Sequence, residues 1–310
     1  MDKKIEDIGE FGLIKAIRKY ADSTGDIYGI GDDCAIIPDS EKEILVTTDA
    51  LVKNVHFYEN SDPYKLGRKS LAVNISDVCA MAADPKWAFL SLSIEPNTKM
   101  DYIDRFIKGF IKMAEEHNIK LLGGDTTKTS VFTINVMLLG INKRNKSIKR
   151  GGAHINEDVY VTGKIGCSYA GLRAINAANA DKYRDLIEYH INPKPRCDIA
   201  LQIRGLATAM IDVSDGLIQD CRHICEESSV GMEIDFNKVP FCCTDIVSKQ
   251  EMLAGGEDYE LVFCAKKEYR ERIEKIKDVR RIGKTVSKNG VRVVKNGQSM
   301  NLAKLGFKHF

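Results

Sequence analysis

Residues 71–85 read LAVNISDVCAMAADP, a helical pattern of small and apolar residues that holds one carboxylate, Asp77. The spacing predicts a helix over 62–82, and the strand-like run WAFLSLSI follows at 87–94. A carboxylate is costly to bury among apolar neighbours, so Asp77 needs a partner. This stretch therefore predicts a helix packed with strands, with one charged group that local packing does not explain.

The rest of the chain alternates between the same two patterns. In the first half, helical periodicity lies at 5–20, 62–82 and 100–117, and strand-like runs lie at 44–48, 87–94 and 131–141. In the second half, strands are predicted at 158–162, 207–212, 231–236 and 259–265, and helices near 167–178, 197–205, 215–228 and 267–277.

A polar, basic stretch at 142–158, NKRNKSIKRGGAHINED, separates the two halves. We place the domain boundary near residue 149, which divides the chain into 1–148 and 149–310. Both halves mix helices with strands. The predicted fold class is therefore α+β with two domains, and not a doubly wound sheet.

Composition excludes several partners. Of the 310 residues, 44% are hydrophobic, which is enough for one large core or two ordinary cores. The 46 Lys and Arg residues nearly cancel the 44 Asp and Glu residues, so neither nucleic acid nor an anionic membrane is an expected partner. The longest apolar runs, such as VMLLGI at 136–141, are too short to span a bilayer. We expect a cytoplasmic protein.

The cysteines lack CxxC spacing and are odd in number, and we expect them to be reduced, buried and small apolar residues. Cys221 and Cys225 lie one helical turn apart, but no second pair supports a soft-metal site. The nine cysteines are Cys34, Cys79, Cys167, Cys197, Cys221, Cys225, Cys242, Cys243 and Cys264.

Aspartates recur at the ends of apolar strands or beside glycines. A single aspartate at a turn is ordinarily a capping residue, but separate occurrences in several loops, together with Asp77, weaken that interpretation. If the loops converge, their carboxylates require a cation, and an all-oxygen set favours Mg²⁺ or Mn²⁺ over zinc. The sequence therefore predicts a site for several Mg²⁺ ions. The loops are Gly31-Asp32-Asp33, Thr47-Thr48-Asp49, Gly123-Gly124-Asp125 and Asp212-Val213-Ser214-Asp215-Gly216.

Such a site usually handles phosphate, yet the common nucleotide-binding motifs are missing. The GKT at 283–285 ends like a phosphate-binding loop, but Asp278 stands where that motif needs glycine. The GIG at 29–31 begins like a dinucleotide fingerprint, but Cys34 replaces its third glycine. A different plan for binding nucleotide is required.

The segment DVSDGLIQDCRHICEES at 212–228 offers part of such a plan. Free amides at the start of its helix could hold phosphate or metal-bound water near Ser214. Ser214 and Asp215 are also good helix N-caps and could serve only in that role. Both interpretations remain open from the sequence.

Six blocks stand in an order that resembles the thiamine-monophosphate kinase family, and the resemblance spans nearly the whole chain. The wider superfamily is similar to aminoimidazole ribonucleotide synthetase, selenophosphate synthetase and the hydrogenase-maturation dehydratase, which use ATP. The blocks are GIGDDCAII (29–37), TTDALVKNVHF (47–57), LAVNISDVCAMAADP (71–85), LLGGDTT (121–127), IDVSDGL (211–217) and GGEDYEL (255–261).

The resemblance implies a two-domain aminoimidazole ribonucleotide synthetase-like fold. Strands of the N-terminal domain would form a β-barrel across a homodimer, and each active site would lie between the two domains. The implied reaction converts ATP and thiamine monophosphate to ADP and thiamine diphosphate, the last step of thiamine diphosphate biosynthesis. Its acceptor is a phosphate monoester, largely dianionic at neutral pH, so no residue is predicted as a general base.

The resemblance also implies roles for individual residues. The implied Mg²⁺ ligands are Asp33, Thr47, Thr48, Asp49, Asp77, Asp125, Asp212 and Asp215. The implied ATP contacts are Tyr102, Gly124, Asp125, Arg150 and Ser214. The implied substrate contacts are His56, Glu257 and Phe310.

The chain departs from the family pattern at Thr47, where serine is frequent, and in the run NVHF at 54–57. Neither departure removes an oxygen ligand or the histidine. Residues 176–190 and 266–300 receive no role.

Two alternatives stay open. One is another ATP-dependent synthetase or dehydratase of the superfamily, although the expected N-terminal catalytic cysteine and Cys-ending tail are missing and the chain ends in Phe310. The other is a non-catalytic, metal-stabilised interaction protein.

Overall fold

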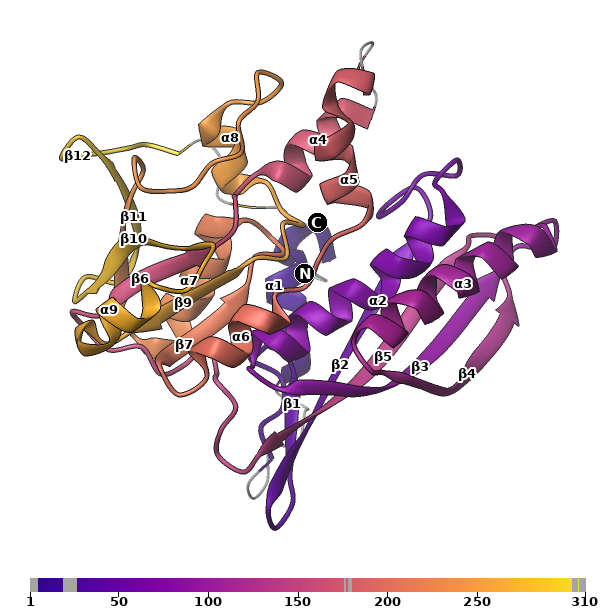
Figure 1. The fold of residues 1–310 in the computed structure, drawn as a ribbon, viewed down its shortest axis with the longest axis horizontal. Helices are drawn as coiled ribbons and strands as arrows, with labels where there is room; N and C mark the ends of the chain where they lie inside the picture. The colour runs from indigo at the N-terminus through magenta and orange to yellow at the C-terminus, as the bar shows by residue number, and fades with distance from the viewer. Residues whose placement is uncertain (1–4, 19–26, 176, 178–179, 303–305, 307–310) are drawn as a thin grey trace.

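The computed structural model describes residues 5–18, 27–175, 177, 180–302 and 306. Its strands form two separate sheets, one from each half of the chain (Figure 1). The first sheet has the order β1-β2-β5-β3-β4, and only β3 and β4 pair in parallel. Its strands are β1 (Ala35–Pro38), β2 (Lys42–Val52), β3 (Asp84–Ile94), β4 (Lys120–Lys128) and β5 (Thr133–Lys143).

Helices α2 (Pro63–Ala80) and α3 (Met100–Glu116) cover one face of this sheet (Figure 1). Asp62 caps α2 by accepting a hydrogen bond from the N–H of Lys65 at 3.0 Å, and Pro63 occupies the first turn, where its missing N–H costs nothing. Helix α1 (Ile5–Arg18) precedes the sheet.

The second sheet has the order β12-β11-β8-β10-β6-β9-β7, in which only β8 and β11 are parallel. Its strands are β6 (Asp158–Thr162), β7 (Ala207–Asp212), β8 (Gly231–Asp235), β9 (Leu261–Ala265), β10 (Val279–Val286), β11 (Gly290–Lys295) and β12 (Gln298–Ser299). The helices of this half are α4 (Cys167–Ile175), α5 (Arg184–Ile191), α6 (Cys197–Ile203), α7 (Leu217–Ser228), α8 (Lys249–Ala254) and α9 (Arg270–Ile273), with 3₁₀ turns η1 (Ala180–Tyr183) and η2 (Lys267–Tyr269).

Alternation along the strands of the second sheet divides its side chains between two cores. Val159 and Val161 of β6 pack in the core that includes α7, whereas Tyr160 between them packs in the core that includes α2. Ile199 and Ile203 of α6 also belong to the core that includes α2. Helix α2 therefore lies between the two halves, which explains why apolar residues surround it on most sides.

The α+β class and the principal elements of both halves are as predicted. The strands β1, β4, β10, β11 and β12 and the helices α5 and α8 were not predicted, and the predicted helix at 267–277 contains only η2 and α9. Strand β4 reads KLLGGDTTK and is exposed along most of its length, so it has neither the apolar run nor the alternation that marks a strand. None of the helices within the described ranges is long and apolar enough to cross a membrane.

The prediction that every cysteine is reduced and buried is wrong at three positions. Cys79 of α2 and Cys197 of α6 form a disulfide, with their Cα atoms 5.0 Å apart, and Cys243 is exposed. The paired cysteines are 118 residues apart in the chain, so no local spacing indicates that the fold brings them together. Cys221 and Cys225 are buried in the core with α7, as expected.

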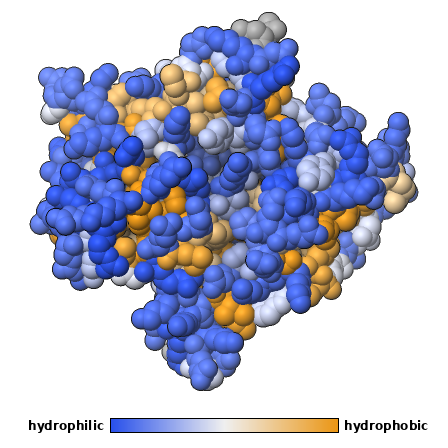
Figure 2. Space-filling model, in the orientation of Figure 1, coloured by the Kyte–Doolittle hydropathy of each residue, from blue (hydrophilic) through white to orange (hydrophobic). Residues whose placement is uncertain are grey.

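The surface is mostly polar, in keeping with the balanced composition. Figure 2 shows polar residues over most of one face, with apolar patches between them. Large exposed apolar side chains on the first sheet include Ile37, Leu122 and Met137. Single exposed apolar residues are ordinary on a protein surface.

Glycines set the distance between α2 and α3. A Cβ atom at Gly109 of α3 would lie 1.8 Å from the carbonyl oxygen of Tyr64, and one at Gly67 of α2 would lie 2.0 Å from that of Phe106. We expect Gly109→Ala to lower the free energy of unfolding by about 1–3 kcal/mol, because the helices must separate. Urea unfolding followed by circular dichroism measures this change. Lys112→Ala, at an exposed position of the same helix, is the control and should change stability by less than about 0.5 kcal/mol. An unchanged midpoint for Gly109→Ala would contradict this packing.

Candidate active site

A cleft of about 1350 Å³ lies between residues of the two halves of the chain. Both sheets, α2, α7 and the loop after α8 contribute to its walls. A cleft of this size accommodates more than one small ligand. The sequence-predicted site residues that line it are Asp33, Thr47, Thr48, Asp49, His56, Asp77, Arg150, Asp212, Ser214, Asp215 and Glu257.

Three carboxylates from distant parts of the chain converge in this cleft. Asp33 comes from the loop before β1, Asp77 from α2 and Asp212 from the end of β7, and each offers an oxygen within 4.8 Å of the others. Asp33 is the carboxylate whose hydrogen bonding is least complete, because its Oδ2 is buried and has no hydrogen-bond partner among the described residues. We refer to Asp33, Asp77 and Asp212 as the acid cluster.

Burial and mutual repulsion disfavour the charged form of these groups. Burial together with Asp49 and Asp212 raises the pKa of Asp77 well above its ordinary value. Burial and Asp33 raise the pKa of Asp212 to about 8. Burial also raises the pKa of Asp49. The cluster therefore binds protons at neutral pH unless a cation replaces them.

Hydrogen bonds to neighbours offset part of this cost. The hydroxyl of Thr47 donates to Asp77 at 2.6 Å, and that of Ser76 donates to Asp212 at 2.5 Å. Arg150 donates from Nη2 to Asp33 at 2.6 Å. One guanidinium cannot neutralise a group of carboxylates, and the unpartnered oxygen of Asp33 remains. These oxygen-only residues fit a hard divalent cation such as Mg²⁺.

The start of α7 adds a second acidic group beside the first. The backbone N–H groups of Asp215 and Gly216 donate to Oδ2 of Asp220 at 3.2 and 3.0 Å. Asp215, Asp220 and His223 each offer a ligand atom within 4.8 Å of the others. Gly216, at φ 120°, is the N-cap, so the interpretation of Ser214 and Asp215 as side-chain N-caps is wrong. The helix begins at Leu217, and both earlier residues face the cleft.

Another part of the cleft contains an ion pair in which the lysine is buried and the glutamate is half-buried. Nζ of Lys69 lies 2.7 Å from Oε1 of Glu257, and Nδ1 of His190 lies 3.4 Å from Oε2 of the same carboxylate. His56 lines this region from the loop after β2, where its Nδ1 accepts a hydrogen bond from the N–H of Val52 at 3.0 Å. The two predicted substrate contacts, His56 and Glu257, thus border the same cleft as the acid cluster.

Three predicted nucleotide or metal contacts lie outside this cleft. Tyr102 of α3 packs against Phe132, with ring centroids 6.0 Å apart. Gly124 and Asp125 lie on the exposed edge strand β4, and a Cβ atom at Gly124 would come within 1.7 Å of the carbonyl oxygen of Leu90. The close approach of the backbone to β3 thus explains this glycine on its own. The predicted substrate contact Phe310 lies outside the described residues.

The side chain of Thr48 is also directed away from the acid cluster. Its hydroxyl donates to the carbonyl oxygen of Val136 at 3.0 Å, and it alternates along β2 with Thr47 and Asp49. Thr48 borders the cleft, but its hydroxyl serves the sheet.

Asp32, which stands in one of the predicted aspartate loops but received no role of its own, also lines the cleft, as do Lys69 and Asp220, which sequence reasoning did not select. Asp32 accepts the N–H of Arg150 at 2.9 Å. Lys69 and Asp220 are charged residues on buried helix faces, exposed by 3% and 1%. The signal that identified Asp77, a charge within an apolar helical pattern, would also have found these two.

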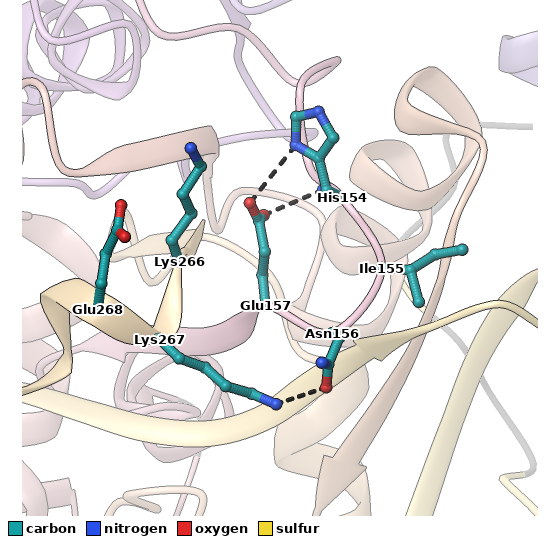
Figure 3. Close-up of a pocket in the computed structure, with 7 residues that line it drawn as sticks. All are labelled: His154, Ile155, Asn156, Glu157, Lys266, Lys267 and Glu268. Carbon is teal, nitrogen blue, oxygen red and sulfur yellow. Dashed lines mark hydrogen bonds and ion pairs between the residues drawn. The ribbon is translucent and has the colours of Figure 1, made fainter.

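A smaller pocket on the second half offers a different lining. Figure 3 shows its loop residues, in which Glu157 accepts the N–H of His154 at 3.1 Å and Lys267 donates to Asn156. Glu157 also accepts the hydroxyl of Thr208 at 2.6 Å. These polar groups bond to one another and tie the two loops together, so the pocket has a structural explanation.

Comparison with known proteins adds the family. Models of AIR synthase related protein match in two parts, the N-terminal domain at residues 31–142 and the C-terminal domain at residues 157–296. The thiamine-monophosphate kinase of Buchnera aphidicola subsp. Acyrthosiphon pisum (strain APS) is 36% identical over 97% of this chain and 98% of its own length. That of Escherichia coli (strain K12) is 37% identical over 82% of each chain.

Solved structures agree. A structure of AaThiL complexed with AMPPCP and TMP covers 100% of both chains, with 32% identity and a TM-score of 0.89. The crystal structure of Escherichia coli HypE, a hydrogenase maturation protein, has 17% identity and a TM-score of 0.66 over 84% of this chain and 87% of its own. The second likeness is one of fold alone. The fold is AIR synthase-like, and the chain belongs to the thiamine-monophosphate kinase family.

Proposed function

We propose that this chain is an enzyme that transfers the γ-phosphoryl group of ATP to thiamine monophosphate, giving ADP and thiamine diphosphate in the cytoplasm as the last step of thiamine diphosphate biosynthesis. The observation that carries the proposal is the acid cluster, in which an oxygen of Asp33 is buried and has no hydrogen-bond partner in the part of the chain that the structure describes. The full-length similarity to thiamine-monophosphate kinases and to a structure that holds AMPPCP and TMP supports the choice of reactants.

The chain would bind several Mg²⁺ ions through the acid cluster together with Asp49, Asp215 and the hydroxyl of Thr47, and with Thr48 and Asp125 as further candidates. Bound Mg²⁺ neutralises phosphoryl oxygens and so reduces the repulsion between a triphosphate and a dianionic acceptor. Because that acceptor is already ionised, the chain needs no general base, and we propose direct in-line transfer without a phosphoenzyme.

The remaining residues orient the two reactants. Arg150 stays cationic, because Asp33 and Asp32 raise its pKa although burial acts in the opposite direction. It is thus suited to bind ATP phosphates, with Ser214 at the start of α7 and with Tyr102 and Gly124 as further candidates. His56, Glu257 and Phe310 would bind thiamine monophosphate. We propose 1–148 as the unit for ATP, Mg²⁺ and dimerisation and 149–310 as the unit that completes the cleft.

ATP turnover measured with and without thiamine monophosphate tests the function. A kinase requires both substrates and Mg²⁺, a synthetase ignores this acceptor, and a binding module shows no turnover. A phosphorylated protein formed with ATP alone would contradict direct transfer.

We expect Asp49→Ala to reduce kcat by at least about 100-fold, because it removes a carboxylate from beside the acid cluster. The melting temperature should stay close to that of the unmodified protein, since burial disfavours the lost charge. Steady-state kinetics and a thermal melt measure both quantities. Asp101→Asn, at an exposed position of α3, is the control. Near-normal kcat in Asp49→Ala would remove this residue from the proposed metal set.

We expect the metal-free protein to lose stability as pH rises between about pH 5 and pH 8. The pKa of Asp212 is about 8 and that of Asp32 about 7, both raised by burial and by Asp33 from an ordinary value of 3.8. In this range the folded protein holds protons that the unfolded chain has released, so raising the pH favours unfolding. Urea unfolding in EDTA at several pH values measures the slope.

Added Mg²⁺ should flatten this slope, because the cation takes the place of the protons. Asp212→Asn should flatten it without metal. If stability in EDTA instead rises with pH, the folded protein does not hold extra protons on these carboxylates, and the prediction is wrong.

We further propose that the enzyme is a homodimer whose first sheets join into a closed barrel. Strand β1 pairs with β2 only as far as Val46, so the edge of β2 beyond that residue has no partner in β1. The opposite edge is β4, which is exposed and carries Leu122 and Asp125. Open edges are normally covered, and two edges of one sheet can pair with those of a second copy.

This arrangement gives Asp125 a role. Asp49 and Gly124 lie in one row across the sheet, separated by β5 and β3, so Asp125 is roughly 14 Å from Asp49 at about 4.8 Å per strand spacing. Within one chain Asp125 is too far away to join the acid cluster. Pairing of β4 with the open edge of β2 in the partner would bring it to the partner's cluster.

Mixed dimers test this proposal. Co-expressed Asp49→Ala and Asp125→Ala chains should recover about a quarter of normal activity, because half of the dimers are mixed and each mixed dimer has one intact site. Co-expressed Asp49→Ala and Asp77→Ala chains are the matched control and should stay inactive, since both residues serve the same chain. Absence of recovery in the first pair, with dimers formed, would contradict a shared site.

A further inference from the structure

Lys69 is a buried cation for which the proposed chemistry gives no role. Its side chain is 4% exposed, and it lies on the same face of α2 as Val73 and Asp77, all three of which line the cleft. Eight residues separate Lys69 from Asp77, which is about 12 Å along a helix. Helix α2 therefore presents an acid to the cleft and, about two turns earlier, a cation.

The partner of Lys69 is held firmly in place. Glu257 has a left-handed backbone with φ 64°, and the preceding Gly256 packs so closely that a Cβ atom there would lie 2.2 Å from the carbonyl oxygen of Ser214. The N–H of Glu257 donates to that same carbonyl at 2.7 Å. Strained backbone held this tightly is typical of a ligand-binding position.

Lys69 occupies only one side of the Glu257 carboxylate. Its Nζ contacts Oε1 at 2.7 Å, whereas Oε2 lies 3.4 Å from Nδ1 of His190, which is 3.0 Å from the hydroxyl of Ser168. Glu257 is 28% exposed, so the carboxylate faces the cleft while Lys69 is covered. Lys69 thus holds the carboxylate from its buried side and leaves its exposed side toward the cleft.

Charge on the surrounding groups favours this assignment. Burial alone would raise the pKa of Glu257, but Lys69, His190 and His56 lower it below its ordinary value. Burial and Lys69 lower the pKa of His190 to about 4, so its ring is neutral at physiological pH. Among the neighbours of Glu257, Lys69 therefore does most to favour the ionised carboxylate.

We propose that Lys69 is a positioning residue for the acceptor: it holds the Glu257 carboxylate in a subsite, bordered by His190, that receives the nitrogen heterocycle of the phosphate-monoester substrate. This inference rests on the proposed function and adds a specificity-determining residue to it. A structural role for the ion pair, as a link between α2 and the loop at 255–259, would affect stability without affecting one substrate selectively.

The test compares the Michaelis constants for the two substrates in Lys69→Met, Lys69→Arg, Glu257→Gln and the double variant Lys69→Met/Glu257→Gln. Lys69→Met should raise KM for thiamine monophosphate at least about tenfold and leave KM for ATP within about twofold. Lys69→Arg, which keeps the charge, should recover part of the loss. The double variant should be no worse than Glu257→Gln alone, because Lys69 acts through Glu257.

Lys108→Met is the matched control. Lys108 lies on α3 away from the cleft, is 67% exposed and pairs with Asp104 at 2.6 Å, so KM for both substrates should stay unchanged. Thermal melts check that each variant folds. If Lys69→Met does not fold, the two KM values are compared in Lys69→Arg and in the double variant, which removes both charges.

The outcomes separate this inference from the proposed function. If the unmodified enzyme does not turn over thiamine monophosphate, both fail. If it does, an unchanged acceptor KM in folded Lys69→Met, an equal rise in both KM values, or additive losses in the double variant would overturn the role of Lys69 alone.

Discussion

The repulsion among buried carboxylates around Asp77 is the constraint on which the rest of the structure depends. Two unit charges about 4 Å apart repel by roughly 4 kcal/mol at an effective dielectric constant of about 20, and the cluster contains three such groups with Asp49 beside them. Arg150 contacts Asp33, and the hydroxyls of Thr47 and Ser76 each satisfy one further carboxylate. A fold that retains this arrangement gives up stability that neutral residues would restore, and the divalent cations that we propose would offset that loss.

Helix α2 connects this cluster with the rest of the cleft, because side chains along it contact the second half of the chain. It lies between the two halves, so polar side chains on its buried faces must find partners inside the protein. Ser76 donates to Asp212 of the other half, Lys69 pairs with Glu257 of the other half, and Cys79 is joined to Cys197. These three side chains thus link α2 to residues of the second half.

What the sequence could predict depended on whether the signal was local. The charge of Asp77 within an apolar helix is visible in a few residues, and so is the alternation of β6, whose side chains divide between two cores. The contents of the site followed from the resemblance of six ordered blocks, because no spacing of aspartates shows that distant loops meet. Strand β4, the pairing of Cys79 with Cys197 and the position of Asp125 depend on contacts across the sheet or between the halves, which leave no local pattern.

Lys69 combines a local sequence signal with a dependence on a distant contact. It has the same local signal as Asp77, a charge on a buried helix face, but its meaning depends on Glu257, which lies 188 positions further along the chain. The pair is close to neutral, so it cannot attract a cationic heterocycle by net charge in the way that we propose the acid cluster attracts Mg²⁺. A fixed dipole at a set distance favours a ligand whose charged and hydrogen-bonding atoms match it, and it disfavours others. Electrostatic complementarity of this kind contributes to selectivity more than to affinity. In the proposed enzyme the acid cluster would therefore supply attraction, and the pair of Lys69 and Glu257 would supply discrimination.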